Sequence, residues 1–168
     1  RYSRDVSRNI FLLGQGNQLV ELREMPYDTE DLLQEFLATH PALLAGDQMN
    51  RSAPRRWLLV SREMGLPSEG QGGMRWSVDH LFIDQDGVPT VIEVKRSSDT
   101  RIRREVIGQI LEYAANAVVY WPIEALRPRF ESSCASDGKD AEDELLRFLG
   151  ESQDAESFWG QVKTNLQA

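Results

Sequence analysis

The chain has 168 residues, 40% of them hydrophobic and 27% charged, which fits one soluble domain, or one domain with a small appendage. No apolar run approaches the roughly 18 residues that a membrane-spanning helix needs, and residues 1–16 lack the apolar centre of a signal peptide. The single cysteine, Cys134, excludes an internal disulfide and a cysteine-based metal cluster. Cytoplasmic residence is therefore the expectation.

The formal net charge of −8 is unevenly distributed along the chain. Residues 1–50 carry 4 basic and 8 acidic side chains, residues 51–104 carry 10 and 7, and residues 105–168 carry 5 and 12. The total charge argues against a nucleic-acid partner, whereas the local excess in the middle segment suits a polyanion. The alternative is that the arginines of this segment are simply solvated surface.

The first predicted elements are a strand and a helix. Residues 18–25 alternate apolar and polar side chains, which predicts a strand that ends at Pro26. Thr29 is then a suitable N-cap for a helix whose first turn holds Glu30 and Asp31 and whose apolar stripe continues to His40. Residues 46–54 are predicted to form a loop.

Three strands are predicted next, over residues 57–61, 76–83 and 89–94. The residues 84–87 (DQDG) form a strong turn signal, so the second and third strands should be antiparallel neighbours. Residues 98–100 then cap a predicted long helix, with Ile110 and Leu111 on its buried side, which ends at Trp121. Residues 131–141 are predicted to be a loop or disordered linker, and residues 142–148 and 157–166 to be short helices.

The predicted organisation has three parts. Residues 1–27 hold N-terminal strands, residues 28–130 form the core, and residues 131–168 form a linker and C-terminal helices. The last helix is amphipathic but has no partner element after it. A further strand or domain is therefore expected beyond residue 168.

Two neighbouring predicted strands carry the residues that point to chemistry. Asp79 is separated by 13 residues from Glu93, and strand periodicity places Glu93 and Lys95 on one face. Two carboxylates brought together by the hairpin would suit Mg²⁺ or Mn²⁺, and a nearby lysine would orient or deprotonate a water or neutralise transition-state charge. A charged, exposed hairpin face is the alternative. The apolar residues around Glu93 and Lys95 favour a paired or metal-bound site, because buried charge is costly.

The ordered set of motifs resembles the PD-(D/E)XK nuclease superfamily of the RecB-like and NucS-like kind. Its signature is a helix with an early Glu, a strand with Asp, a turn, a hydrophobic-Glu-x-Lys strand and a helix with Gln-x-x-x-Tyr. This chain has TEDLLQEFLATHPALL, SVDHLFIDQDG, VIEVKR and IGQILEYA, which place the motif residues at Glu30, Asp79, Glu93, Lys95, Gln109 and Tyr113. The resemblance covers residues 28–120, and Val78 stands where the family name has proline.

The resemblance implies both a fold and an activity. The fold is an α/β restriction-endonuclease-like core of three layers, with a central mixed sheet flanked by helices. The activity is metal-dependent hydrolysis of DNA phosphodiester bonds by an activated water, with Mg²⁺ or Mn²⁺ as cofactor. DNA is the expected partner, and a homodimer is considered.

The resemblance also implies a role for each motif residue. Asp79, Glu93 and the backbone carbonyl of Val94 would ligate the metal, and Glu30 would ligate it or support its ligands. Lys95 would be the catalytic lysine. Gln109 and Tyr113, one helical turn apart, would steady the lysine, the water or the substrate strand.

Several assignments keep an alternative. Glu35 competes with Glu30, although it lies on a different side of the same helix. The arginines after the motif either contact phosphate or are a solvated face; they are Arg96, Arg101, Arg103 and Arg104. His80 should turn away from the metal face and be structural. The rival functions are an inactive nuclease-fold module that binds nucleic acid or protein, and an assembly domain that uses acidic residues 140–156.

Overall fold

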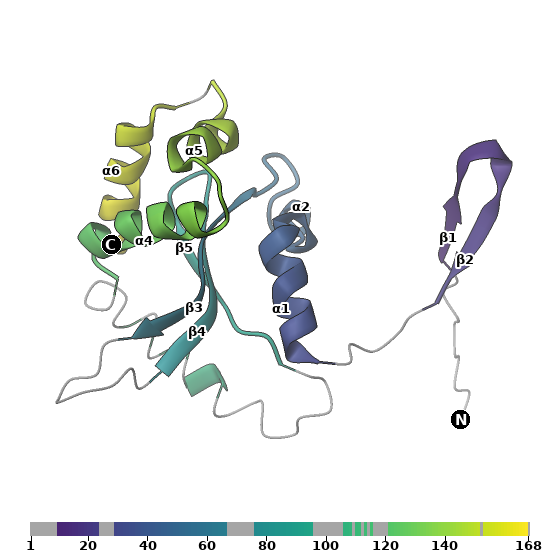
Figure 1. Cartoon of the computed structure of the whole chain (residues 1–168), viewed down its shortest axis with the longest axis horizontal. Helices are drawn as coiled ribbons and strands as arrows, with labels where there is room; N and C mark the ends of the chain where they lie inside the picture. Colours follow the sequence, from purple (N-terminus) through teal and green to yellow (C-terminus); the bar gives the residue numbers. More distant parts are fainter. Residues whose placement is uncertain are drawn as a thin grey trace.

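The computed structural model describes residues 10–23, 29–66, 76–95, 106–108, 110, 111, 113, 115, 121–151 and 153–167. These residues form two antiparallel sheets and several helices (Figure 1). The first sheet is a hairpin of β1 (Ile10–Leu13) and β2 (Leu19–Leu22). The second contains β3 (Trp57–Leu66), β4 (Trp76–Asp84) and β5 (Pro89–Ile92), in the order β3-β4-β5.

Helix α1 (Glu30–Thr39) confirms the prediction made from its N-terminal residues. The Leu32 N–H donates to Thr29 Oγ1 at 3.2 Å, so Thr29 is the N-cap. The helix ends at His40, whose N–H donates to the Phe36 carbonyl at 2.7 Å. A short 3-10 turn, Pro41–Leu43, follows, and the predicted loop after it contains one short helix, α2 (Gly46–Met49).

The turn between β4 and β5 forms as the DQDG signal predicts. Asp84 Oδ1 accepts hydrogen bonds from the N–H groups of Asp86 and Val88, each at 2.9 Å, and Gly87 has a positive φ of 74°. The buried Asp84 also forms an ion pair with Arg55. The register of β4 and β5 therefore starts from a turn that is fixed by the Asp84 side chain and by the backbone conformation of Gly87.

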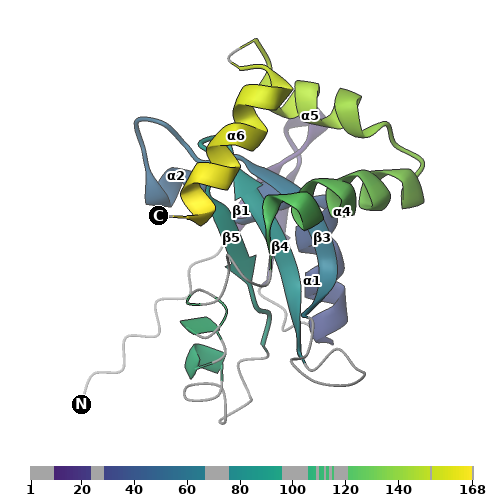
Figure 2. The ribbon, with the colours of Figure 1, turned by 90° about the vertical axis from the view of Figure 1, so that its left-hand side faces the viewer.

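Helices cover both faces of the larger sheet. In Figure 2, α4 (Ile123–Ser136), α5 (Ala141–Leu149) and α6 (Ala155–Leu166) lie in front of the strands and α1 lies behind them. Leu81 and Ile83 of β4 are fully buried in one cluster with Leu126 of α4 and Phe158 of α6. The terminal helices therefore share the core of the sheet.

The predicted central mixed sheet is not shown by the described residues, in which this sheet is three-stranded and antiparallel. Its strands follow one another in the chain and reverse direction at each connection. A parallel strand would need a crossover connection. Much of the connection between β5 and α4, residues 96–105 and 116–120, lies outside the described residues.

The predicted loop or disordered linker over residues 131–141 is wrong for most of its length, and only residues 137–140 form a loop. Residues up to Ser136 continue α4, because Leu126, Phe130 and Cys134 recur every four residues and are buried, while the serines between them face outward. The predicted helices after it are confirmed as α5 and α6. The prediction that Ile110 and Leu111 are buried is also wrong, because 36% of Ile110 and 64% of Leu111 are exposed. None of the described helices could span a membrane.

A candidate metal site at the end of the central hairpin

The site begins where the pairing of β4 and β5 ends. The last paired residues are His80 and Ile92, and continuing this register by one residue sets Asp79 opposite Glu93. The Val94 N–H donates to Asp79 Oδ2 at 2.7 Å. Just beyond β5, the backbone therefore bonds to the Asp79 side chain instead of to the backbone of β4. This bond fixes one carboxylate oxygen of Asp79 against the backbone between Glu93 and Lys95.

Lys95 and Glu93 form a close ion pair. Lys95 Nζ lies 2.7 Å from Glu93 Oε1 and 3.9 Å from Glu30 Oε2, so one ammonium group links the end of the hairpin to the first residue of α1. Burial lowers the pKa of Lys95, but the hydrogen bond and charge of Glu93, together with Asp79 and Glu30, outweigh it and raise the pKa above its ordinary value.

The Glu93 carboxylate is the most buried charge of the site. Its side chain is only 5% exposed, and its second oxygen, Oε2, accepts no hydrogen bond from any described residue. A buried carboxylate oxygen without a donor is unfavourable unless a cation or an ordered water completes it. This oxygen belongs to the residue that the continued register sets opposite Asp79, and it fits a hard divalent cation.

The protein ligands available to such a cation are few. Within the described parts of the chain, no three His, Cys, Asp or Glu side chains gather closely enough to hold a metal ion by themselves. Mg²⁺ is compatible with such a site, because it usually keeps several waters and binds one or two carboxylates plus substrate phosphates. The geometry therefore fits a metal shared with a substrate better than a closed structural site.

Two side chains from the sheet hold α1 in place. Arg62 of β3 forms an ion pair with Asp31 and lies 3.4 Å from Gln34 Oε1. His80 Nε2 lies 2.8 Å from the Gln34 carbonyl, which only accepts, so Nε2 carries the hydrogen. Glu30 is therefore placed by contacts in the first turns of its helix. Sequence reasoning missed Arg62, since nothing in its local pattern marks it.

His80 has the structural role that strand alternation predicts. It is fully buried, stacks on Phe82 with ring centroids 5.7 Å apart, and bonds to α1 rather than to the candidate metal ligands. Burial lowers the pKa of His80 below its ordinary value. The neutral imidazole of His80 thus connects β4 to α1.

The remaining predicted site residues are either buried in the core, exposed elsewhere or outside the described residues. Tyr113 is 1% exposed, and its ring lies 6.2 Å from that of Trp121, so its aromatic body belongs to the core. Glu35 is exposed and lines a separate groove. The other members lie outside the described residues: Gln109, Arg96, Arg101, Arg103 and Arg104.

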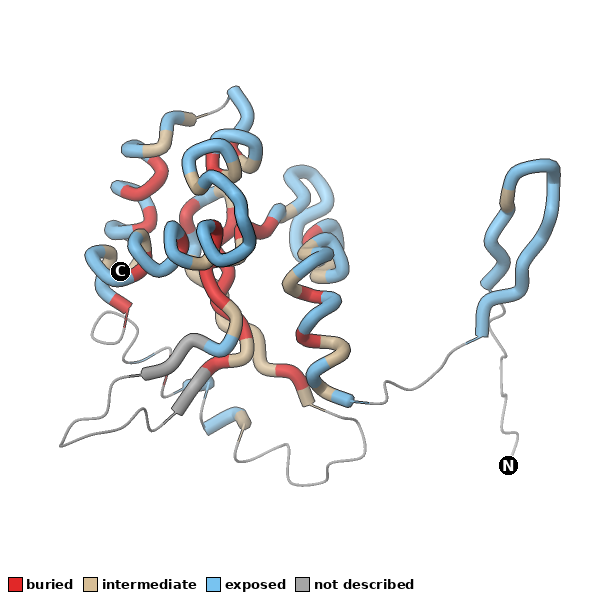
Figure 3. Tube along the Cα trace, viewed as in Figure 1, coloured by how far each residue is buried: buried red, intermediate tan, exposed pale blue. Residues whose placement is uncertain are grey.

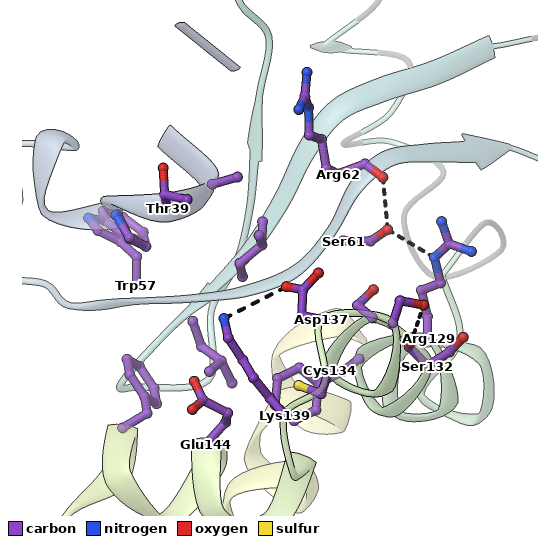
Figure 4. A pocket seen from close by; sticks show the side chains of 18 of the residues that line it. Thr39, Trp57, Ser61, Arg62, Arg129, Ser132, Cys134, Asp137, Lys139 and Glu144 are labelled. Atoms are coloured by element: carbon purple, nitrogen blue, oxygen red, sulfur yellow. Dashed lines mark hydrogen bonds and ion pairs between the residues drawn. The ribbon is translucent and has the colours of Figure 1, made fainter. Parts of the chain in front are cut away.

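A groove of about 710 Å³ lies apart from the candidate site. It runs along β3 between α1 on one side and α4 and α5 on the other, and none of the four charged site residues lines it (Figure 4). Inside it, the Arg129 Nε–H donates to Ser61 Oγ at 2.9 Å. The candidate metal site and this groove are thus separate features.

Comparisons with known proteins add no family for this chain. No family model matches it, and neither the curated proteins nor the solved structures contain a match.

Proposed function

We propose that this chain is a metal-dependent nuclease domain of the restriction-endonuclease-like fold, which hydrolyses DNA phosphodiester bonds with an activated water. The observation that carries the proposal is the buried Glu93 carboxylate. Oε1 is paired with Lys95, Oε2 has no donor among the described residues, and Asp79 is fixed beside it through the Val94 N–H. Such an arrangement costs stability in a purely structural hairpin. It is useful where a cation and a phosphate complete the site.

The proposal assigns a role to each residue around the site. Asp79 and Glu93 hold Mg²⁺ or Mn²⁺, with the Val94 carbonyl as a further oxygen ligand. Lys95, kept positive by its acidic neighbours, orients the attacking water and offsets negative charge that builds up on the phosphate. Glu30 sets the position of the Lys95 ammonium group. The bound metal supplies Lewis-acid activation of the water and the phosphate.

The substrate class follows from charge. DNA brings phosphate oxygens that complete the metal's coordination, and the middle of the sequence is its only basic segment. Gln109, Tyr113 and the arginines at 96, 101, 103 and 104 keep their proposed parts in steadying the lysine and contacting the phosphates.

The second candidate is a nuclease-fold module that binds nucleic acid or a protein without hydrolysis. One observation favours it: the described residues bring no third acidic, His or Cys ligand to the site. Under this alternative Lys95 neutralises Glu93 permanently, and the ion pair holds the end of the hairpin together.

The two candidates separate in one set of assays. The 168-residue chain is incubated with single-stranded, double-stranded and branched DNA, with Mg²⁺, with Mn²⁺ or with a chelator. We expect cleavage that needs the metal and is lost in Glu93→Gln and in Lys95→Met. Glu35→Gln is the matched control, because Glu35 is an exposed acid of α1. This variant should cleave DNA like the parent chain.

Calorimetric titration with Mg²⁺ gives a readout besides activity. We expect heat of binding from the parent chain and none from Glu93→Gln. DNA binding without cleavage by the parent chain supports the inactive module. Cleavage that survives both Glu93→Gln and Lys95→Met contradicts the assigned site.

A further inference from the structure

The hairpin of β1 and β2 is apolar on both faces. Its register pairs Ile10 with Leu22 and Leu12 with Val20 on one face, and Leu13 with Leu19 on the other. Seven of its eight strand residues are large hydrophobics, each between 46% and 69% exposed, and the eighth is Glu21. Figure 3 shows both strands of the hairpin as exposed, away from the buried centre of the molecule.

Such a hairpin calls for a partner that covers both faces. An isolated two-stranded hairpin is at best marginally stable in water, and a sheet with one solvated face carries polar residues on that face. The pattern seen here, apolar on successive residues, is that of a strand buried between two layers. Packing on a flat surface would leave one apolar face in water.

The groove along β3 could accommodate such a strand. In the described part of the sheet β3 is an edge strand, paired only with β4. The groove is bounded by α1 on one side of that edge and by α4 and α5 on the other, so a strand added to β3 would contact helices on both faces. Its lining combines apolar residues such as Leu59 and Phe148 with many polar and charged ones. Among the charged residues, Arg62 and Arg129 have apolar stems that can pack against a strand.

The shorter strand of the hairpin also fits within the length of the groove. The residues of β3 that line the groove extend from Trp57 to Arg62, a span of about 20 Å at 3.3–3.4 Å per residue. The four-residue strand Ile10–Leu13 is about 13 Å long on the same scale and carries no charged side chain. It is therefore the strand of the hairpin best suited to lie against β3.

We propose that the hairpin of one copy of this chain inserts into the groove of a second copy, with Ile10–Leu13 extending the sheet at β3. The exchange is reciprocal, as in a two-fold dimer. This inference is independent of the proposed nuclease activity. Each copy contributes eight hairpin residues and the fifteen groove residues that are not already buried in the single chain, 23 in all.

The size of this interface favours the exchange over simpler contacts. A standard stable interface uses about 20–30 residues from each partner, so the exchange supplies enough. Packing one hairpin face on its copy would use four strand residues from each chain. A contact of that size is too small for a stable dimer.

Light scattering coupled to size-exclusion chromatography tests the proposal on the 168-residue chain. The parent chain should have twice the mass of one copy. The hairpin variant Leu12→Asp/Leu13→Asp, which places a charge on each face, should have the mass of one copy. So should the groove variants Ser133→Trp and Ala38→Trp, which fill the groove from opposite walls. Leu146→Asp, an exposed apolar residue of α5 outside the groove, is the control and should remain dimeric.

Mixing the two kinds of variant distinguishes the arrangement. The hairpin variant retains an intact groove, and the Ser133→Trp variant retains an intact hairpin, so together they should form a mixed dimer through one of the two contacts. This dimer should be weaker than the parent dimer, because it uses half of the interface, and it should form at a higher protein concentration. Circular dichroism of each variant verifies that its helices are intact. A monomeric parent chain overturns the proposal, and so does a mixture that stays monomeric, because a hairpin-to-hairpin dimer or a hairpin folded onto its own groove gives that result.

Discussion

His80 on β4 reaches across to the backbone of Gln34 on α1, with Nε2 2.8 Å from the carbonyl oxygen. The two residues are separated by 46 positions in the sequence, and both are buried. Gln34 lies one helical turn after Glu30, and His80 follows Asp79 directly. The hydrogen bond therefore connects the two elements that carry acidic groups of the candidate site, without touching either acid.

Replacing His80 with leucine should loosen α1. His80→Leu keeps an apolar body but removes the donor, and we expect a loss of about 1–2 kcal/mol in the free energy of unfolding. The amides of α1 should also exchange with solvent faster than in the parent chain. Urea unfolding and hydrogen exchange measure the two effects.

Phe82→Leu is the matched control for His80→Leu. Phe82 is fully buried beside His80, so its truncation should cost a comparable free energy through lost packing while the contact to α1 remains. Equal acceleration of α1 exchange in both variants would show that the hydrogen bond does not hold the helix.

Asp79 allows stability and activity to be separated. Asp79→Asn retains an oxygen that accepts from the Val94 N–H, so its free energy of unfolding should stay within about 0.5 kcal/mol of the parent value. Asp79→Ala loses the acceptor and should cost about 1–2 kcal/mol. Both should lose metal binding and reduce DNA cleavage by about 100-fold or more. An active Asp79→Asn protein would remove Asp79 from the metal ligands.

The two glutamates of α1 should differ in their effect on the site. Glu30 lies 3.9 Å from the Lys95 ammonium group, while Glu35 is exposed on the side of the groove. Glu30→Gln should weaken Mg²⁺ binding or cleavage by about 10–100-fold, because it changes the charge that positions Lys95. Glu35→Gln should leave both unchanged. The reverse order would assign the role to Glu35.

The N-cap of α6 should contribute to acid sensitivity. Hydrogen bonds from Ser157 hold the pKa of Asp154 below its ordinary value, so the unfolded chain binds a proton more readily than the folded chain. Stability from this group is present above the ordinary carboxyl pKa and is lost as the pH falls through the lower, folded value. Asp154→Asn keeps an acceptor but not the titration.

Chemical denaturation at a series of pH values measures that contribution. The difference in free energy of unfolding between the parent chain and Asp154→Asn should be constant above about pH 5 and shrink below it. A difference that stays constant down to the acid transition would contradict the role of Asp154.

Local sequence signals predicted the elements that position the site. The Thr29 cap and the DQDG turn depend on neighbours in the chain, and each is found in the structure. The strand predicted over residues 89–94 is found only as far as Ile92, so it ends before Glu93. The pairing of Lys95 with Glu93 follows from their two-residue spacing. Each of these features is determined by interactions between residues that are close together in the sequence.

Features that depend on distant partners could not be predicted in this way. The segment after Glu131 looked like a linker because its serines are polar, yet Phe130 and Cys134 pack into a core built by residues far along the chain. The exposure of Leu111 likewise depends on which elements cover it. The bonds from Arg62 and His80 to α1 cross from strand to helix, and no local pattern specifies them.

The last helix also has a consequence for how the chain is made. Asn165 Nδ2 donates to the Asp86 carbonyl at 2.9 Å, across 79 positions, and a Cβ on Gly87 would stand 3.1 Å from the Val162 backbone nitrogen. At about 5–20 residues per second, a ribosome needs about 4–16 s to synthesise the intervening residues. During that time the turn before Glu93 has no helix to close on. The contact between this turn and α6 can therefore form only after α6 itself has been synthesised.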